Sequence, residues 1–301
     1  MKKKKRLSMF DACIYAIMIV ILVMVLYPLY FTVIASFSNA RAVASGQVVW
    51  KPVGFTLEAY KHVFTYKAIW KGYGNSLFYM IVGTLFNLAL TIPAAYGMSK
   101  KFLPGRGAIM TVFLITMYFG GGMIPTYLLV KNLGLLNTRM TLVILSGLSI
   151  YNMIVTRVYF STSIPGTLYE AAEIDGASEM KKFVSIALPL AKPIIAVMAL
   201  YYGVSRWNSY YTALIYTSRS DLEPLQVVLR KVLLLGQSVL NDELWDSNLE
   251  MEEILARIEK MYMAYTLKYA VVFVASAPLL IAYPFVQKYF VKGVMIGALK
   301  E

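Results

Sequence analysis

The sequence predicts an all-α integral membrane protein with six transmembrane helices. Of its 301 residues 59% are hydrophobic, and a mean hydropathy of +0.62 is too apolar for a soluble domain. Its long apolar stretches carry almost no charge, and a helix needs about 20 residues to cross a hydrocarbon layer about 30 Å thick. The predicted spans are about 10–37, 75–99, 107–131, 140–163, 190–216 and 268–290.

The basic residues predict the orientation of these spans. The formal net charge is +13, which could also indicate a nucleic-acid partner. With both ends inside, the cytoplasmic pieces hold 15 basic and 6 acidic residues, against 13 and 10 in the outer pieces. This asymmetry follows the positive-inside rule. We therefore expect an N-in, C-in topology, membrane lipid as a partner, and no nucleic acid.

The first span follows a basic segment, Lys2–Arg6, and in this respect resembles a signal peptide. Its apolar run is longer than an h-region of 7–15 residues, which favours an uncleaved helix with a kink at Pro28. Small residues at 42–44 leave cleavage as the alternative. Cys13, the single cysteine, lies in this span and cannot form an intrachain disulfide.

Residues 38–74 are expected outside, with a short interfacial helix at 57–64. The single histidine, His62, has no matching cluster of acids or cysteines, so we interpret it as a surface residue. In the second span, Asn87 is a polar position that favours close packing or a polar passage. In the third span, Gly120–Gly122 predict a break, which serves either as a mobile gate or for close packing.

The fifth span contains a charged and aromatic cluster, which is costly in lipid unless it faces protein or water. Its residues predict a translocation path formed by Arg206, Trp207, Asn208 and Tyr210. The alternative is an interfacial aromatic belt from which Arg206 extends to water. The outer segment 217–267 follows, with nine acidic and five basic residues and expected helices at 225–235 and 248–262. It lacks a calcium-loop pattern, and we interpret it as a solvated face.

A polar segment, 164–189, separates the fourth span from the fifth and is predicted to be a cytoplasmic helix-turn-helix. Pro165 suits the start of a helix, and Gly176 is a natural C-terminal stop for the helix that ends near Asp175. Ser178 can cap a second helix, 179–188, which Pro189 is expected to close.

The same segment resembles the EAA loop of ABC-importer permeases. The match consists of Glu170-Ala171-Ala172, then Gly176, then nine residues, then Ile186-Ala187-Leu188-Pro189. The resemblance implies that this loop docks on a separate ATPase. The implied ATPase-coupling residues are Glu170, Ala171, Ala172, Asp175, Gly176, Ile186, Leu188 and Pro189.

Softer matches resemble the carbohydrate branch of these permeases, the maltose (MalG-like) type, and within it the LplC/YtcP subgroup for polysaccharide fragments. They are the stretch from Arg206 to Tyr210, the segment Asp221–Gln226, and the ending KGVMIGALKE. The resemblance implies the ABC type I importer permease fold and a multi-pass subunit in a bacterial cytoplasmic membrane. Such a subunit would form half of an oligosaccharide path. Its implied partners are a second permease, an ATP-binding cassette ATPase dimer and an extracytoplasmic sugar-binding lipoprotein.

No GxxxxGK[ST] phosphate loop occurs in the chain, so ATP and Mg²⁺ are expected on the partner ATPase. We expect no cofactor or metal on this chain and no enzymatic activity. Three other functions are alternatives for this sequence: an ABC permease for a non-sugar solute, a stand-alone secondary transporter and a membrane enzyme. A secondary transporter would need internal repeats and intramembrane acids, and an enzyme would need clustered catalytic groups; the sequence has no clear sign of either.

Overall fold

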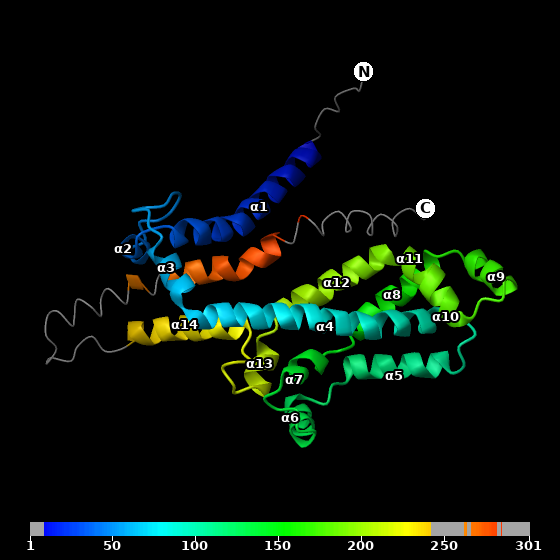
Figure 1. The fold of residues 1–301 in the computed structure, drawn as a ribbon. Coiled ribbons are helices and arrows are strands. Elements are labelled where there is room, and N and C mark those ends of the chain that lie inside the picture. Colours follow the sequence, from blue (N-terminus) through cyan, green and yellow to red (C-terminus); the bar gives the residue numbers. More distant parts are fainter. Residues whose placement is uncertain (1–8, 242–261, 264–265, 282–283, 285–301) are drawn as a thin grey trace. The chain divides into compact units, whose positions relative to one another are not determined.

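A computed structural model describes residues 9–241, 262–263, 266–281 and 284, and the regular structure within them is helical (Figure 1). The expected features at Lys2–Arg6, at 248–261 and in the C-terminal tail lie outside the described residues. The chain divides into two compact units, 1–69 with 229–277 and 70–228 with 278–301. Helices α4 (Lys67–Ser99) and α14 (Leu225–Asn241) each contribute residues to both.

The first unit contains α1 (Met9–Ser36), α2 (Ala40–Ala44), α3 (Glu58–Thr65) and residues 266–277 of an apolar helix, Thr266–Ile281. The most apolar part of α1 has a mean hydropathy of 2.7 and no buried residue. So much exposed apolar surface requires a hydrocarbon environment. Only the end of α1 is buried, where Ile34 and Ala35 pack with Ala42, Val43 and Val48.

The second unit contains the loop expected to couple to an ATPase. Its remaining elements are α5 (Arg106–Tyr118), α6 (Met123–Asn132), α7 (Arg139–Ile144), α8 (Ile150–Thr162), α9 (Gly166–Ile174), α10 (Glu179–Lys182), the π-turn η1 (Phe183–Ala187), α11 (Leu188–Leu190), α12 (Lys192–Trp207) and α13 (Tyr211–Tyr216). Its core is formed where α4, α8 and α12 pack, with Ala95, Met153 and Met198 fully buried.

Several expected spans are interrupted. Among the described residues, α1 and α4 are long and apolar enough to cross a membrane unbroken, and two bent helix pairs meet the same test when each is taken as one span. These pairs are α5 with α6, bent by 109°, and Glu179–Leu190 with α12, bent by 77°. The fourth predicted span is divided into α7 and α8, and the fifth into α12 and α13.

The α7–α8 interruption has a local cause. Ser146 has a φ of +61°, a left-handed conformation that is costly for residues other than glycine. At Gly147 an added Cβ would lie 2.8 Å from Phe86 and 3.0 Å from the Ile144 carbonyl oxygen. The chain therefore turns sharply between the helices, in a segment we call the break (residues 145–149). The sequence predicted a continuous helix here.

The glycine triplet between α5 and α6 interrupts the third span where the sequence placed a break. A Cβ at Gly120 or Gly121 would meet no atom within 4 Å, so close packing within this chain does not require either glycine. Gly122 is different, because its φ of +83° and ψ of 170° belong to a region that only glycine adopts readily.

Candidate functional site

The loop 164–189 folds as a helical hairpin around Gly176. α9 ends at Ile174 with Asp175 as its C-cap, and Gly176 has a φ of +70°. The amide of Gly176 donates to the Glu173 carbonyl (3.0 Å), and that of Ala177 donates to the Ala172 carbonyl (2.8 Å). This pair of bonds is the Schellman arrangement that closes a helix. Ser178 then caps α10, accepting from the Lys181 amide at 3.3 Å, as the sequence predicted.

The hairpin presents apolar side chains to its surroundings. α9 has no buried residue, and its last side chain, Ile174, is 88% exposed. Met180, just beyond the turn, is 69% exposed. Exposed apolar side chains at the tip of a helical hairpin form a surface suited to a partner protein.

A lysine inside the hairpin holds its two arms together. The Nζ of Lys182 lies 3.1 Å from a carboxylate oxygen of Glu173 on α9 and 2.9 Å from one of Glu179 on α10. The lysine side chain is only 5% exposed, whereas the glutamates remain accessible. The hydrogen bonds that Lys182 donates to Glu179 and Glu173 raise the pKa of Lys182 above its ordinary value, so it stays charged. The hydroxyl of Tyr96 donates to Glu179 at 3.3 Å, which links the hairpin to α4.

A second cation anchors the beginning of the hairpin. Nζ of Lys100, just after α4, lies 3.2 Å from the ring centroid of Tyr169 and 4.5 Å from that of Tyr96. Both are cation–π contacts. Burial lowers the pKa of Lys100 and raises that of Tyr169. These contacts fix α9 to the end of α4.

The residues expected to couple to an ATPase are spread over this hairpin. Glu170, Ala171 and Ala172 are on α9, Asp175 and Gly176 form the turn, Ile186 is in the π-turn, and Leu188 and Pro189 are in α11. The second arm of the hairpin is helical from Glu179 to Leu190, so it ends one residue beyond Pro189, where the sequence placed its close, and the bend comes at Ala191.

Arg206 of α12 is buried and donates five hydrogen bonds. Its Nε donates to Oδ1 of Asn87 on α4 at 2.9 Å. Its two terminal nitrogens donate to four backbone carbonyls at the end of α7 and in the break: Leu142 (2.8 Å), Val143 (2.9 Å), Leu145 (3.0 Å) and Ser146 (3.3 Å). These are carbonyls that the end of a helix leaves without an intrahelical partner. Arg206 thus satisfies the backbone of the break.

Asn87 completes this arrangement from the opposite side. Its Nδ2 donates to the carbonyls of Ser146 (2.7 Å) and Gly147 (2.6 Å). One helical turn away, the hydroxyls of Thr91 and Tyr202 lie 2.6 Å apart, and the Ser149 amide donates to the Tyr202 hydroxyl at 3.3 Å. We call Asn87, Thr91, Tyr202 and Arg206 the polar ladder.

The other residues expected in a translocation path lie in different settings. Trp207 is 1% exposed, with its ring centroid 5.9 Å from that of Tyr73, whereas Asn208 and Tyr210 are exposed between α12 and α13. Arg206 does not extend toward water, so the snorkelling alternative does not describe it. The path itself stays a prediction for these four residues.

The segment Asp221–Gln226, one of the softer family matches, is fixed to the beginning of the second span. Nδ2 of Asn75 on α4 donates to the backbone carbonyls of Asp221 (2.8 Å) and Glu223 (3.0 Å). The Tyr79 hydroxyl donates to the backbone carbonyl of Leu222 at 2.9 Å. Asn75 therefore binds two carbonyls as Asn87 does, but in the segment 221–223 and not in the break; its Oδ1 also accepts from Arg139 of α7 at 3.4 Å.

Sequence reasoning missed Lys182 and the ladder partners Thr91 and Tyr202. The spacing of Glu179 and Lys182 by three positions is a signal for an ion pair on one helix. No sequence pattern indicates that the lysine would be buried.

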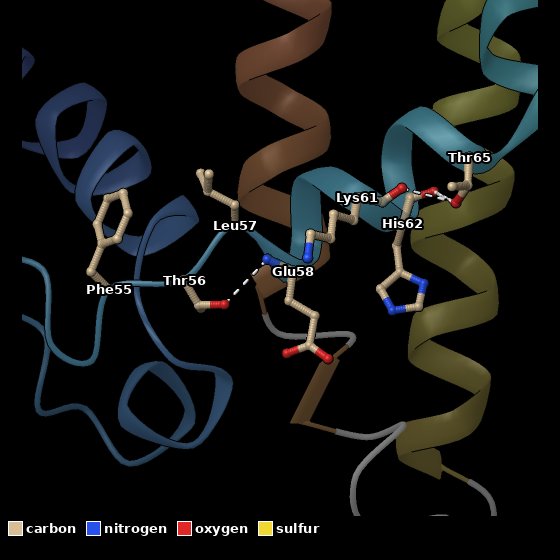
Figure 2. A pocket seen from close by; sticks show the side chains of 7 residues that line it. All are labelled: Phe55, Thr56, Leu57, Glu58, Lys61, His62 and Thr65. Atoms are coloured by element: carbon tan, nitrogen blue, oxygen red, sulfur yellow. Dashed lines mark hydrogen bonds between the residues drawn. The ribbon is translucent and has the colours of Figure 1, made fainter.

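The first unit carries a separate open groove of about 710 Å³ beside α3. Figure 2 shows its lining, which mixes charged and apolar side chains: Phe55, Thr56, Leu57, Glu58, Lys61, His62 and Thr65. His62 is exposed, as predicted. Among the described residues no group of three or more histidines, cysteines or acids could hold a metal ion.

Comparison with known proteins gives a consistent result. The chain is 35% identical to the polygalacturonan/rhamnogalacturonan transport system permease protein YtcP of Bacillus subtilis, over 97% of this chain and 98% of that protein. It is 36% identical to protein LplC of the same organism, over 100% of this chain and 98% of that protein. A crystal structure of a bacterial ABC transporter that imports the acidic polysaccharide alginate matches with a TM-score of 0.80 and 33% identity, covering 94% of this chain and 98% of that one.

The family comparison defines the class of the protein. Residues 67–296, from the start of α4 onward, match the binding-protein-dependent transport system inner membrane component family. This confirms the resemblance to ABC-importer permeases and the type I permease fold. The chain belongs to this family, and it is a permease subunit of a transport system rather than an enzyme.

Proposed function

We propose that this chain is the permease subunit of an ATP-driven importer for oligosaccharides, forming half of the translocation path. The observation that carries the proposal is the full-length similarity to YtcP and to the alginate importer, both of which handle polysaccharides. The hairpin 164–189 would couple the chain to a separate ATPase. Its exposed Ile174 and its closed turn at Gly176 support this role, because they present a rigid apolar tip.

The proposal includes six spans with both ends inside a bacterial cytoplasmic membrane. The spans would be α1, α4, α5 with α6, α7 with α8, α12 with α13, and the span that includes the helix Thr266–Ile281. The excess of basic residues in the inner pieces supports this orientation. The partners would be a second permease, an ATPase dimer and an extracytoplasmic sugar-binding lipoprotein.

We further assign the cargo to acidic oligosaccharides. Polygalacturonan and alginate are both polymers of uronic acids, which carry a carboxylate on each such sugar unit. The five acceptors of Arg206 are an amide and four carbonyls, all uncharged, so its positive charge is not neutralised by these contacts. A positive charge inside the spans favours an anionic cargo.

The test of coupling uses Gly176→Asp, with Gly176→Asn as the matched control. Both side chains are similar in size and tolerate a left-handed backbone, and a Cβ here meets no atom of the described residues within 4 Å. The tagged protein is purified in mild detergent and its partners are identified by mass spectrometry. We expect the parent and the Asn variant to retain an ATPase and a second permease, and the Asp variant to lose the ATPase.

The cargo is tested by uptake in cells that lack the chromosomal copy. Labelled oligogalacturonides should enter cells that carry the parent chain and not those that carry Gly176→Asp, and neutral maltodextrins should compete weakly. Uptake of a non-sugar solute instead would favour the alternative function, an ABC permease for a solute that is not a sugar. Transport by the purified chain alone, without an ATPase, would favour a secondary transporter.

A further inference from the structure

The break between α7 and α8 is held from two sides by the polar ladder. Asn87 and Thr91 are four residues apart on α4, and Tyr202 and Arg206 are four residues apart on α12. Residues at this spacing lie on the same face of a helix, so the two pairs form successive rungs between the helices. Both rungs also reach the break. The first donates six hydrogen bonds to carbonyls of the α7 end and the break, four from Arg206 and two from Asn87, and the second accepts one from the Ser149 amide.

The ladder has little room to rearrange. Arg206, Asn87 and Thr91 are 8%, 0% and 0% exposed. A Cβ at Gly83 would lie 2.9 Å from Nε of Arg206, so α4 approaches the guanidinium as closely as a glycine permits. Moving Arg206 away would leave the carbonyls at the end of α7 without partners inside a membrane-spanning region, where water is not available to replace them.

α12 connects this ladder to the hairpin. The hairpin's second arm continues through η1 and α11, bends at Ala191, and becomes α12, whose other end carries Tyr202 and Arg206. A displacement of the hairpin is thus transmitted along one helix to the ladder. Because packed helices move as rigid bodies, the segments bonded to this end of α12 must move with it or lose their hydrogen bonds.

We infer that Arg206 and Asn87 are positioning residues that make the break move together with α12, so that a displacement of the hairpin reaches residues 145–149. This inference rests on the proposed coupling function. It assigns the polar ladder a role in transmission and not in contact with the cargo.

The experiment uses the assembled importer purified with its partners, with Cys13 replaced by alanine so that one reporter cysteine can be placed at a time. Ile144→Cys reports on the end of α7, where the native side chain is 39% exposed, and Ile174→Cys reports on the hairpin. The rate of maleimide labelling is compared between the nucleotide-free complex and the complex trapped with ATP and vanadate. No cargo is needed for this readout.

In the parent, we expect trapping to change the labelling rate at both reporters. Asn87→Ala should abolish the change at residue 144 and preserve it at residue 174. The matched control is Asn75→Ala, which removes a buried asparagine of α4 (5% exposed, against 0% for Asn87) that donates to the carbonyls of Asp221 and Glu223 and not to the break. It also removes a 3.4 Å hydrogen bond from Arg139 at the start of α7, so it controls for a weakened contact between α4 and α7. It should preserve both changes. Arg206→Lys should behave as Asn87→Ala does, because an ammonium group cannot span the same five acceptors.

Three outcomes would overturn the inference. The first is a normal change at residue 144 in both Asn87→Ala and Arg206→Lys. The second is loss of the change at both reporters in Asn87→Ala, which would indicate a general structural defect. The third is a parent complex in which trapping changes the labelling rate at residue 174 but not at residue 144. A parent without any response at residue 174 would instead refute the proposed coupling function, and the inference with it.

Discussion

Nε of Arg206 donates a hydrogen bond of 2.9 Å to Oδ1 of Asn87, although the two residues lie 119 positions apart in the chain. This contact joins the helix that follows the hairpin to the longest helix of the second unit. The side chain of Arg206 is packed closely against α4 at this contact, so a substitution on α4 can test the packing.

Gly83→Ala should destabilise the protein, because its Cβ would lie 2.9 Å from Nε and 3.0 Å from Cδ of a guanidinium that is held by five hydrogen bonds. Crowding of this kind costs about 2 kcal/mol. Gly97→Ala is the matched control on the same helix, where a Cβ meets nothing within 4 Å. It should be neutral or stabilise by up to about 1 kcal/mol, since alanine favours a helix. Thermal unfolding of the purified complex measures both; equal midpoints would contradict the packing described for Arg206.

Lys182→Met should loosen the hairpin, because it removes the cation between Glu173 and Glu179 and leaves two carboxylates facing each other. Lys181→Met is the control, since Lys181 is exposed and has no ion pair among the described residues. Hydrogen exchange of α9 amides should be faster in the first variant only. Similar exchange in the two variants would show that the ion pairs do not stabilise the hairpin.

The contribution of Lys182 should not vary with pH near neutrality. Its pKa is raised above the ordinary 10.5, so the stabilisation is fully present below that value and is lost only as pH rises through the raised pKa. α9 exchange rates, corrected for intrinsic chemistry, should therefore stay constant between about pH 7 and 9. A loss of protection within this interval would be inconsistent with a charged, paired Lys182.

Gly176→Val should disrupt the hairpin turn, whereas Gly176→Asn should preserve it. The φ of +70° costs a β-branched residue about 2 kcal/mol, while asparagine adopts this conformation more readily. The two amides of the Schellman arrangement, those of residues 176 and 177, report on the turn by hydrogen exchange. If valine and asparagine gave the same protection, backbone strain would not be the reason for glycine at this position.

Among the three glycines between α5 and α6, only Gly122 should be sensitive to alanine. Its positive φ makes alanine unfavourable by about 1 kcal/mol or more, whereas Gly120 and Gly121 have open space around them. Transport and thermal unfolding of the three single alanine variants test whether only the variant at Gly122 is impaired. A transport defect in Gly120→Ala with unchanged stability would show that another subunit of the importer packs at this glycine.

Local chemistry allowed much of the hairpin to be predicted. Ser178 is a good N-cap and Gly176 suits the left-handed end of a helix, and each acts through its own neighbours. The family resemblance came from the same residues. Pro189 is also a local signal, because a proline disfavours continuation of a helix, and the helical arm ends one residue beyond it, at Leu190.

The ladder could not be predicted in the same way. The sequence marks Arg206 and Asn87 as costly in a span, but the partners that satisfy them are carbonyls of a helix end that hydropathy did not reveal. The break depends on Ser146 at a positive φ and on the close approach of Phe86 to Gly147, which are tertiary effects. For the same reason, the fourth and fifth spans were expected to be continuous.

The π-turn Phe183–Ala187 has a consequence for the length of the chain. Its wide turn, in which the Leu188 amide bonds to the Phe183 carbonyl, accommodates one residue more than an α-helix would over the same path. Deleting one residue within the π-turn would leave an ordinary α-helical turn over the same path, whereas inserting one more residue would rotate everything that follows by about 100° about the helix axis. Lys182 is fixed on one side of this stretch and Arg206 on the other. Residues 183–191 therefore act as a spacer of fixed register, which should tolerate substitutions of similar size, or loss of the one extra residue, far better than an insertion.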